Sequence, residues 1–187
     1  MRIIGGDFRG RNLVTPVGMD TRPTTDRVRE NMFNVLQNRL EFSDIRVLDL
    51  FAGSGALGIE AISRGAAFCF FVEQTAKACK AIQTNLNAFG LENCAKIKRS
   101  DATKLGTPGL MELFDLVFAD PPYSGGFGEK AAKSLVEQGW LTKNAVFVLE
   151  ESRKSMPHSL PGFDAPDIRS YGDTSIGIFD VFQNSSN

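Results

Sequence analysis

The chain has 187 residues, of which 42% are hydrophobic and 23% are charged, as is usual for a globular protein of one domain. Its longest apolar run, residues 66–72, is much shorter than the roughly 20 residues that a membrane helix needs, so no membrane-spanning segment is expected. With 21 Lys and Arg against 22 Asp and Glu the formal net charge is −1, and this total alone argues against a strongly basic nucleic-acid binder.

Residues 1–40 are predicted to form a basic extension that ends in a helix. Glycines near the start of the chain favour short strands or a hairpin, and the helix is expected to reach about Leu40. Residues 1–39 contain seven arginines, no lysine and four acidic residues, hence a formal charge of +3, which leaves −4 for the other 148 residues. The candidate N-caps of the helix are Thr24, Thr25 and Asp26, and its expected apolar face consists of Val28, Met32, Val35 and Leu36.

From about residue 45 onward, short apolar runs alternate with helical patterns. The runs are apolar on both faces, which favours a parallel sheet covered by helices. The fold class is therefore α/β: a doubly wound, mostly parallel seven-stranded sheet that ends in an antiparallel hairpin, with residues 1–187 forming one domain and residues 41–187 its core. The predicted strands span residues 46–51, 67–72, 95–100, 113–119, 145–150, 168–171 and 174–182, and the predicted helices span residues 57–64, 75–89 and 129–138.

Histidines and paired cysteines, which zinc sites and nucleophilic triads use, are scarce. Cys69, Cys79 and Cys94 form no CxxC pair, and His158 is the only histidine. A Ser-His-Asp triad or a two-histidine zinc site is therefore hard to build, so we expect no metal. The first residues lack the apolar core of a signal peptide, so we expect a cytoplasmic protein with free thiols.

A glycine-rich loop follows the strand at residues 46–51 and opens the next helix. Residues 53–58 fit the pattern GxGxxG, in which glycines let the backbone approach a ligand while the helix N-terminus favours anionic groups. Glu73 lies 20 residues beyond Gly53, where a carboxylate can accept hydrogen bonds from ribose hydroxyls. The loop predicts a nucleoside-containing cofactor, either a dinucleotide or S-adenosylmethionine (SAM); the alternative is a strand-helix turn without a ligand.

A second motif, Asp120-Pro121-Pro122-Tyr123, follows the apolar strand at residues 113–119, at the edge where open α/β sheets bind ligands. The two prolines fix the backbone and remove two donors, so that carbonyl oxygens are left as acceptors. A carboxylate, carbonyls and an aromatic ring at one place suit a planar substrate that carries an NH2 group. Such acceptors would turn the nitrogen lone pair toward an electrophile while Tyr123 stacks on the ring. The alternative is a proline turn with Tyr123 as packing.

Several segments together resemble a known family. Residues 47–61 are similar to the SAM-binding motif of class I methyltransferases, and residues 120–123 to the catalytic motif of members that methylate amines. Residues 2–13 and 22–36, with residues 171–174, resemble the bacterial 16S ribosomal RNA (guanine-N2)-methyltransferases over almost the whole chain. The resemblance implies a Rossmann-like fold, SAM as cofactor, and a monomer that methylates the N2 amine of a guanine in ribosomal RNA, within a partly or fully assembled small ribosomal subunit.

The resemblance also implies roles for residues at matching positions. Asp49 and the glycine loop would hold the methionine part of SAM, and Glu73 its ribose. Asp101 would contact the adenine amino group, although a helix N-cap is an alternative for this residue. The expected catalytic residues are Asp120, Pro121 and Tyr123, and the expected cofactor-binding residues are Asp49, Phe51, Ala52, Gly53, Gly55, Glu73, Asp101 and Ala102.

The arginines of the basic extension are expected to contact RNA, because a guanidinium group suits phosphate and stacks on bases. For any one of them the alternative is a solvated face or an internal ion pair. Arg22, Arg27 and Arg29 would alternatively order the N-terminal segment over the cofactor site. The expected RNA-binding residues are Arg2, Arg9, Arg11, Arg22, Arg27 and Arg29, of which the first three are the stronger candidates.

Other functions are open at this point. The second motif also fits methylation of adenine N6 in nucleic acid or of a protein glutamine amide. An NAD-dependent oxidoreductase would use the glycine loop for a pyrophosphate but leaves the second motif unexplained. An RNA-binding module with a vestigial cofactor fold is a third class, against which the intact Asp49, Glu73 and second motif argue.

Overall fold

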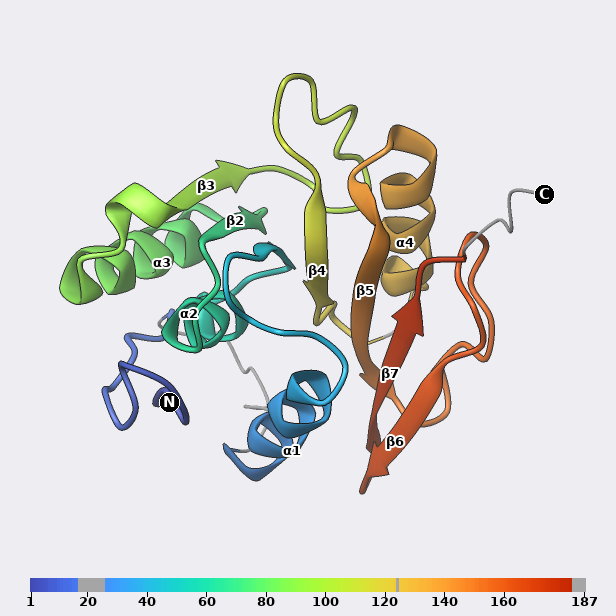
Figure 1. The fold of residues 1–187 in the computed structure, drawn as a ribbon, viewed down its shortest axis with the longest axis horizontal. Coiled ribbons are helices and arrows are strands. Elements are labelled where there is room, and N and C mark those ends of the chain that lie inside the picture. The colour runs from blue at the N-terminus through green and yellow to red at the C-terminus, as the bar shows by residue number, and fades with distance from the viewer. Residues whose placement is uncertain (17–25, 124, 183–187) are drawn as a thin grey trace.

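The computed structural model describes residues 1–16, 26–123 and 125–182, and a seven-stranded sheet forms its centre (Figure 1). The strand order is β3-β2-β1-β4-β5-β7-β6, in which β7 pairs antiparallel with both β5 and β6 and the other neighbours pair parallel. This order confirms the predicted doubly wound sheet with a terminal hairpin. The strands are β1 (Arg46–Leu50), β2 (Phe68–Glu73), β3 (Ala95–Arg99), β4 (Phe114–Ala119), β5 (Leu141–Ser152), β6 (Asp167–Tyr171) and β7 (Thr174–Asp180).

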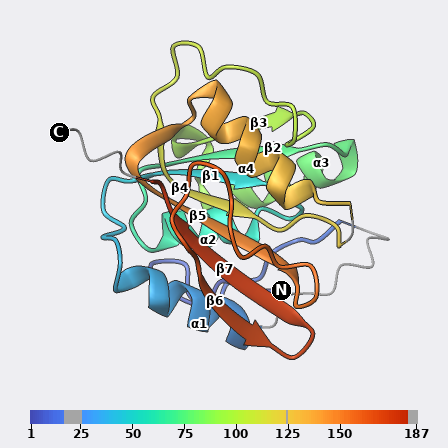
Figure 2. The same cartoon turned by 90° about the vertical axis from the view of Figure 1, so that its right-hand side faces the viewer.

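Helices cover both faces of the sheet. α1 (Asp26–Gln37), α2 (Ala56–Ser63) and α3 (Ala76–Phe89) share one core cluster, whereas α4 (Phe127–Gln138) packs in a second cluster. Figure 2 shows α1 and α4 on opposite sides of the sheet. Because alternate strand residues point to opposite faces, burial on both sides explains why the strands are apolar throughout. Within the described residues, no helix combines the length and the apolar character needed to cross a membrane.

The register brings the predicted motifs to one edge of the sheet. β1 pairs in parallel with both β2 and β4, so the glycine loop after β1, Glu73 at the end of β2 and Asp120 after β4 lie at the carboxyl ends of adjacent strands. β4 and β5 pair in parallel up to Ala119 and Leu149, which makes Asp120 and Glu150 the next residues of two neighbouring strands. The sheet therefore gathers both motifs on its carboxyl edge.

The helix predicted at residues 75–89 is present as α3, Ala76–Phe89, and both of its ends are capped. The Thr75 hydroxyl accepts a hydrogen bond from the Ala78 N–H at 3.3 Å, and Gly90 ends the helix with φ 70°. A short 3-10 helix, η1 (Glu92–Cys94), then leads into β3. Local sequence signals were sufficient here because each cap is made by a neighbour in the chain.

α1 differs from its prediction at its end and on its buried face. It ends at Gln37 rather than near Leu40, and Thr24 and Thr25 lie outside the described residues. Its buried side chains are Arg29, Met32, Phe33 and Leu36, whereas the predicted face residues Val28 and Val35 are only half-buried.

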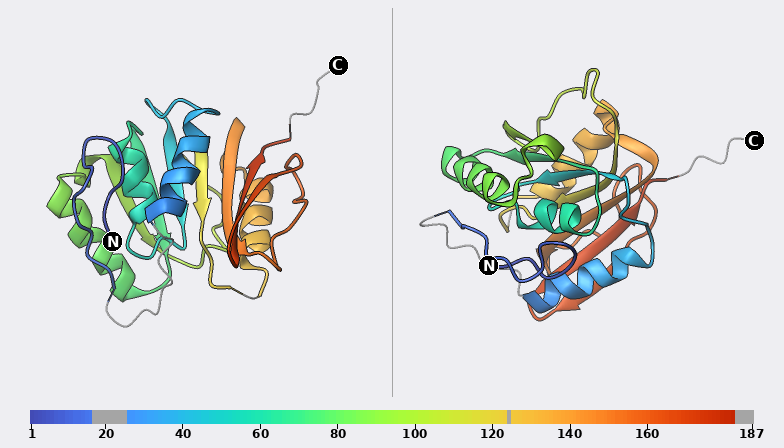
Figure 3. Two further views of the ribbon diagram at one scale, coloured as in Figure 1. Left: turned by 90° about the horizontal axis from the view of Figure 1, so that it is seen from below. Right: turned by 60° about the vertical axis from the view of Figure 1, so that its left-hand side comes forward.

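The first residues form a compact turn rather than an extended arm. A single β-bridge joins Arg2 to Asn12, and the Ile3 N–H donates to the Arg11 carbonyl at 3.0 Å. Figure 3 shows this segment beside α2. The predicted hairpin is therefore present as one bridge, and it is fixed against the core.

Candidate active site

The second motif lies where β4 ends. Asp120 is half-buried, Pro121 is buried and Tyr123 is half-buried. On β5 beside them, Glu150 and Glu151 are 7% and 4% exposed. Burial, together with the negative charges of Glu150, Asp49 and Glu151, raises the pKa of Asp120 well above its usual range. The edge of the sheet therefore carries a buried group of carboxyls next to an aromatic ring.

The Tyr123 hydroxyl contacts side chains from two strands. It lies 3.0 Å from the Thr174 hydroxyl at the start of β7 and 3.4 Å from a Glu150 carboxylate oxygen in β5. Burial raises the pKa of Tyr123, an effect that the Thr174 contact opposes and Glu150 reinforces. The terminal hairpin thus contributes a side chain to this edge of the sheet.

The glycine loop is held by the carboxylate of Glu73. The Gly53 N–H donates to one oxygen at 3.0 Å and the Thr75 N–H to the other at 2.8 Å. Gly53 has φ 56°, and a Cβ atom there would meet nothing nearer than the Phe51 carbonyl oxygen at 3.9 Å. The space beside this glycine is therefore open, as a bound ligand requires.

Phe51 adopts the same left-handed conformation as Gly53, with φ 56°, although it has a side chain. A bulky residue in this region carries strain that the surrounding fold must offset, and such strain is concentrated at functional sites. Ala52, the next residue, is 9% exposed. The sequence pattern placed both residues beside the cofactor site but gave no signal for the strained backbone.

Asp49 lies beneath the loop and is 2% exposed. Its carboxylate accepts a hydrogen bond from the Gly58 N–H at 2.9 Å, which anchors the first turn of α2. Burial raises the pKa of Asp49 to about 8, with a further increase from Glu73 and an opposing effect from the Gly58 hydrogen bond. Asp49 therefore supports the glycine loop from beneath, through its hydrogen bond to the start of α2.

Gly58, the third glycine of the loop pattern, serves the packing of helix on strand. A Cβ atom on Gly58 would lie 2.4 Å from Cε1 of Phe71 and 2.5 Å from the Cys69 sulfur, both on β2. Any side chain there would push α2 away from the sheet.

Asp101 forms a local turn after β3. Its carboxylate accepts from the Thr103 N–H at 2.9 Å and from the Thr103 hydroxyl at 2.7 Å, and these hydrogen bonds lower the pKa of Asp101. Residues 101–113 form no helix, so the helix N-cap alternative was wrong. Ala102 is 3% exposed and packs in the core cluster on the α4 side of the sheet.

Asn85 joins three segments, and sequence reasoning missed it. Its side-chain nitrogen donates to the carbonyls of Val14 and Ser54, each at 2.9 Å, and its oxygen accepts from the Val14 N–H at 2.8 Å. It is 1% exposed. The signal was its place on the apolar stripe of α3, three residues after Ile82, where a polar side chain needs a buried partner.

Glu60 is a second missed residue. It is fully buried within α2 and accepts the N–H groups of Ile4 and Gly5 at 2.7 and 2.8 Å. It also accepts from Nε of Arg64 at 2.8 Å. An acidic residue inside an otherwise apolar helix is the signal that predicts such a partner. Glu60 fixes the N-terminal segment against the helix that follows the glycine loop.

The predicted RNA-binding arginines have different environments. Arg9 and Arg27 are exposed. Arg2 is exposed and pairs with Asp26 at 2.8 Å, and Arg22 lies outside the described residues. The Arg11 guanidinium lies 4.0 Å from the centre of the Phe89 ring, so part of its stacking capacity is used within the protein.

Arg29 corrects one prediction. It is 1% exposed, so its side chain is not on a surface that RNA reaches. It donates to the Arg2 carbonyl and to Asp26, each at 2.8 Å, while its Nε and Nη1 atoms have no partner within the described residues. These contacts match the alternative reading, in which Arg29 orders the N-terminal segment.

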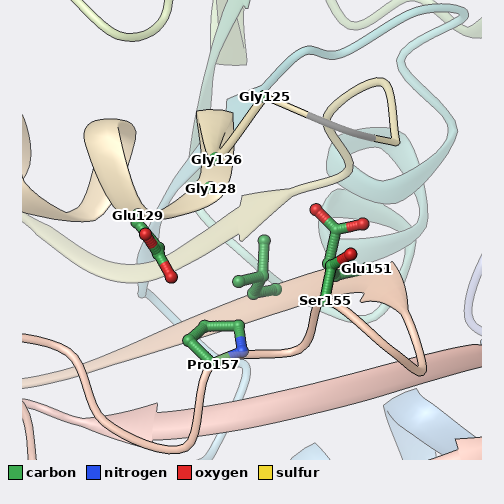
Figure 4. A pocket seen from close by; sticks show the side chains of 8 residues that line it. Gly125, Gly126, Gly128, Glu129, Glu151, Ser155 and Pro157 are labelled. Atoms are coloured by element: carbon green, nitrogen blue, oxygen red, sulfur yellow. The ribbon is translucent and has the colours of Figure 1, made fainter.

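A small cavity lies between the start of α4 and β5 (Figure 4). Its volume is about 60 Å³, space for only a few water molecules, so it does not accommodate a nucleobase. The described residues contain no cluster of three His, Cys, Asp or Glu side chains that is able to hold a metal ion. The cavity is lined by Gly125, Gly126, Gly128, Glu129, Leu149, Glu151, Ser155 and Pro157.

Comparison with known proteins places this geometry in context. Residues 1–180 match the family described as Conserved hypothetical protein 95. Ribosomal RNA small subunit methyltransferase D of Escherichia coli (strain K12) is 40% identical over 162 residues, 84% of this chain and 78% of that protein. YlbH of Bacillus subtilis (strain 168) is 37% identical over 186 residues, 96% of this chain and 98% of that protein. The solved structure of yhhF from Escherichia coli has a TM-score of 0.83 at 34% identity and covers 97% of each chain.

Proposed function

This chain belongs to the Conserved hypothetical protein 95 family, which includes the small-subunit ribosomal RNA methyltransferases D, and we propose that it methylates the exocyclic N2 amine of a guanine in 16S ribosomal RNA with SAM as the methyl donor. The observation that carries the proposal is the meeting of two motifs at adjacent strand ends. The glycine loop follows β1, and Asp120-Pro121-Pro122-Tyr123 follows β4, its direct neighbour. One motif suits a nucleoside cofactor, and the other suits an amine on a planar ring.

The residues at the glycine loop fit SAM. The open space beside Gly53 leaves room for close approach of a ligand to the backbone. Each Glu73 oxygen accepts one backbone N–H and keeps a second lone pair for a ribose hydroxyl. Asp49 holds the start of α2, where the methionine part of SAM would bind, and Asp101, two residues after β3, would contact the adenine amino group.

When bound, SAM supplies a methyl group on a positively charged sulfur. The chain's own residues hold the acceptor amine. Asp120 and the Pro121 carbonyl accept its two N–H bonds and direct the nitrogen lone pair toward the methyl carbon, while the Tyr123 ring stacks on the base. Placement of this kind contributes up to roughly 7–11 kcal/mol to catalysis. The Asp120 carboxylate is also positioned to receive the proton that the amine loses after attack.

The exposed arginines of the basic extension supply RNA contacts. Arg2, Arg9 and Arg27 are exposed on the N-terminal segment and α1. The target base leaves its stack to enter the site, which costs a few kcal/mol in a duplex and less in a loop. We further propose that the protein acts as a cytoplasmic monomer on a partly or fully assembled small ribosomal subunit, whose shape adds specificity that a charge of +3 does not provide.

The test is the identity of the product. SAM with a labelled methyl group is offered with naked 16S ribosomal RNA and with the small subunit, and the RNA is digested to nucleosides. N2-methylguanosine is the expected product. N6-methyladenosine, or methylated glutamine in the subunit proteins, would select the alternative acceptors, and label in neither fraction would contradict the proposal.

A further inference from the structure

Side chains of two neighbouring strands meet at the phenol group of Tyr123. Tyr123 follows β4, Glu150 lies in β5, and Thr174 is the first residue of β7. The Tyr123 oxygen is 3.0 Å from the Thr174 hydroxyl and 3.4 Å from the Glu150 carboxylate. These contacts connect residues 120–123, the predicted catalytic loop, to the terminal hairpin, which is far from them in sequence.

The donors and acceptors have one arrangement that satisfies both contacts. The Tyr123 O–H donates to a carboxylate oxygen of Glu150. The Thr174 hydroxyl then donates to the Tyr123 oxygen. Both hydrogen-bonding directions of the phenol are used, and its ring is the part that remains available to a substrate.

The antiparallel direction of β7 is what places Thr174 at this edge. Thr174 pairs with Ser152 at the carboxyl end of β5. A parallel strand in the same position would begin at the opposite edge of the sheet, away from the catalytic loop. The turn at Gly172 and Asp173 therefore delivers the first side chain of β7 to the site.

We propose that Thr174 and Glu150 are positioning residues that fix the ring of Tyr123 over the acceptor base. Tyr123 is half-buried, and without the two hydrogen bonds its ring is free to take other rotamers at the open edge. The tether holds the ring in one orientation before the base arrives, so that less ordering remains at the moment of reaction. This inference rests on the proposed function, because it assumes that an acceptor ring binds against Tyr123.

A double-mutant cycle tests the tether. Tyr123→Phe keeps the ring and removes the phenol oxygen, and Thr174→Val keeps the shape of the side chain and removes its hydroxyl. Thr174→Val loses one hydrogen bond and is expected to lower kcat about fivefold. Tyr123→Phe loses both hydrogen bonds of the phenol and is expected to lower kcat at least as much, and the double variant no further than Tyr123→Phe. Thr174→Ser is expected to restore wild-type kcat. SAM affinity and the thermal midpoint are measured for each variant, so that a loss of fold is separated from a loss of ring placement.

Ser170→Ala is the matched control. It removes a hydroxyl of the same hairpin that lies 2.8 Å from the Ser175 hydroxyl and, within the described residues, has no hydrogen bond to residues 120–123. It is expected to leave kcat unchanged. Wild-type kcat in Tyr123→Phe, or additive losses in the double variant, would overturn the tether. All variants are assayed on whichever base the wild type methylates, so an adenine product would overturn the proposed target while the cycle still decides the tether.

Discussion

The side-chain amide of Asn85 donates to the Ser54 carbonyl at 2.9 Å, and so connects the buried stripe of α3 to the glycine loop. The same side chain makes two hydrogen bonds to the backbone of Val14. One buried amide thus determines the relative position of the cofactor loop and the N-terminal segment.

Replacement of Asn85 tests this connection. Asn85→Ala removes three hydrogen bonds and leaves the buried Ser54 carbonyl without its Asn85 donor, so we expect a loss of about 2–3 kcal/mol in the free energy of unfolding and weaker SAM binding by about tenfold. Asn87→Ala on the exposed side of the same helix is the control, with a change expected within about 0.5 kcal/mol. Denaturant unfolding and calorimetric titration with SAM measure the two effects, and equal behaviour of the variants would contradict the role of Asn85.

We expect the stability of the protein to depend on pH because the pKa of Asp49 is raised. Its pKa is about 8 in the folded protein against an ordinary 3.8, so its contribution to stability is fully present below pH 3.8 and is lost as the pH rises through about 8. The free energy of unfolding is therefore expected to fall between these values. Asp49→Asn keeps an oxygen for the Gly58 N–H but does not ionise.

The measurement is urea unfolding of both proteins across this pH range. As the pH rises from about 5 to about 8, the free energy of unfolding of Asp49→Asn is expected to increase relative to that of the wild type by at least about 1 kcal/mol. The SAM affinity of the variant is expected to be lower than that of the wild type. Parallel pH profiles of the two proteins would show that the Asp49 carboxyl titrates as an ordinary one.

We expect the titration of Asp120 to determine the acidic limb of the pH–rate profile. Burial and, next, the charge of Glu150 raise the pKa of Asp120, so the acidic limb of kcat/KM is expected well above the range of an ordinary carboxyl. Glu150→Gln removes a negative charge, which lowers the pKa of Asp120 and moves the limb toward lower pH. Glu151→Gln, whose effect on Asp120 is smaller, is expected to move the limb less. A limb that stays in place in Glu150→Gln would argue that Asp120 is not the group that titrates.

We expect replacement of an exposed arginine to affect RNA binding and replacement of a buried arginine to affect stability. Arg9→Ala is expected to weaken RNA binding and to reduce the salt dependence of binding by about one phosphate contact, with stability unchanged. Arg29→Ala is expected to lower stability, because Arg29 is buried and holds the Arg2 carbonyl. Lys143→Ala, an exposed cation near the start of β5, is the control for charge. The measurement is RNA affinity at several salt concentrations. If Arg9→Ala binds RNA as Lys143→Ala does, Arg9 does not belong to the RNA interface.

The sheet and its motifs were predictable because their signals are local. Each strand is a short apolar run buried on both faces, and the caps of α3 are made by adjacent residues such as Thr75 and Gly90. The two motifs follow apolar strands directly, and parallel pairing then brings them to one edge. For these elements, periodicity and spacing contain nearly all of the required information.

The buried polar groups were not predictable in the same way. The chemistry of the guanidinium group predicts RNA contact for Arg29, with ordering of the N-terminal segment as the alternative, and no local pattern assigns a role to Asn85 or Glu60. Their partners are backbone groups of segments distant in sequence, so their burial depends on tertiary contacts that no local pattern contains. An isolated polar residue on an apolar helix face is the signal that would have found Asn85 and Glu60.

The most direct test of the proposed function is methyl transfer by Asp120→Ala in a single turnover at saturating SAM. Asp120 is expected to hold the acceptor amine rather than the cofactor, so transfer to guanine N2 should fall by at least about a hundredfold. SAM affinity, measured on the same sample by calorimetry, should stay near the wild-type value. Formation of N2-methylguanosine at the wild-type rate by Asp120→Ala would contradict the account.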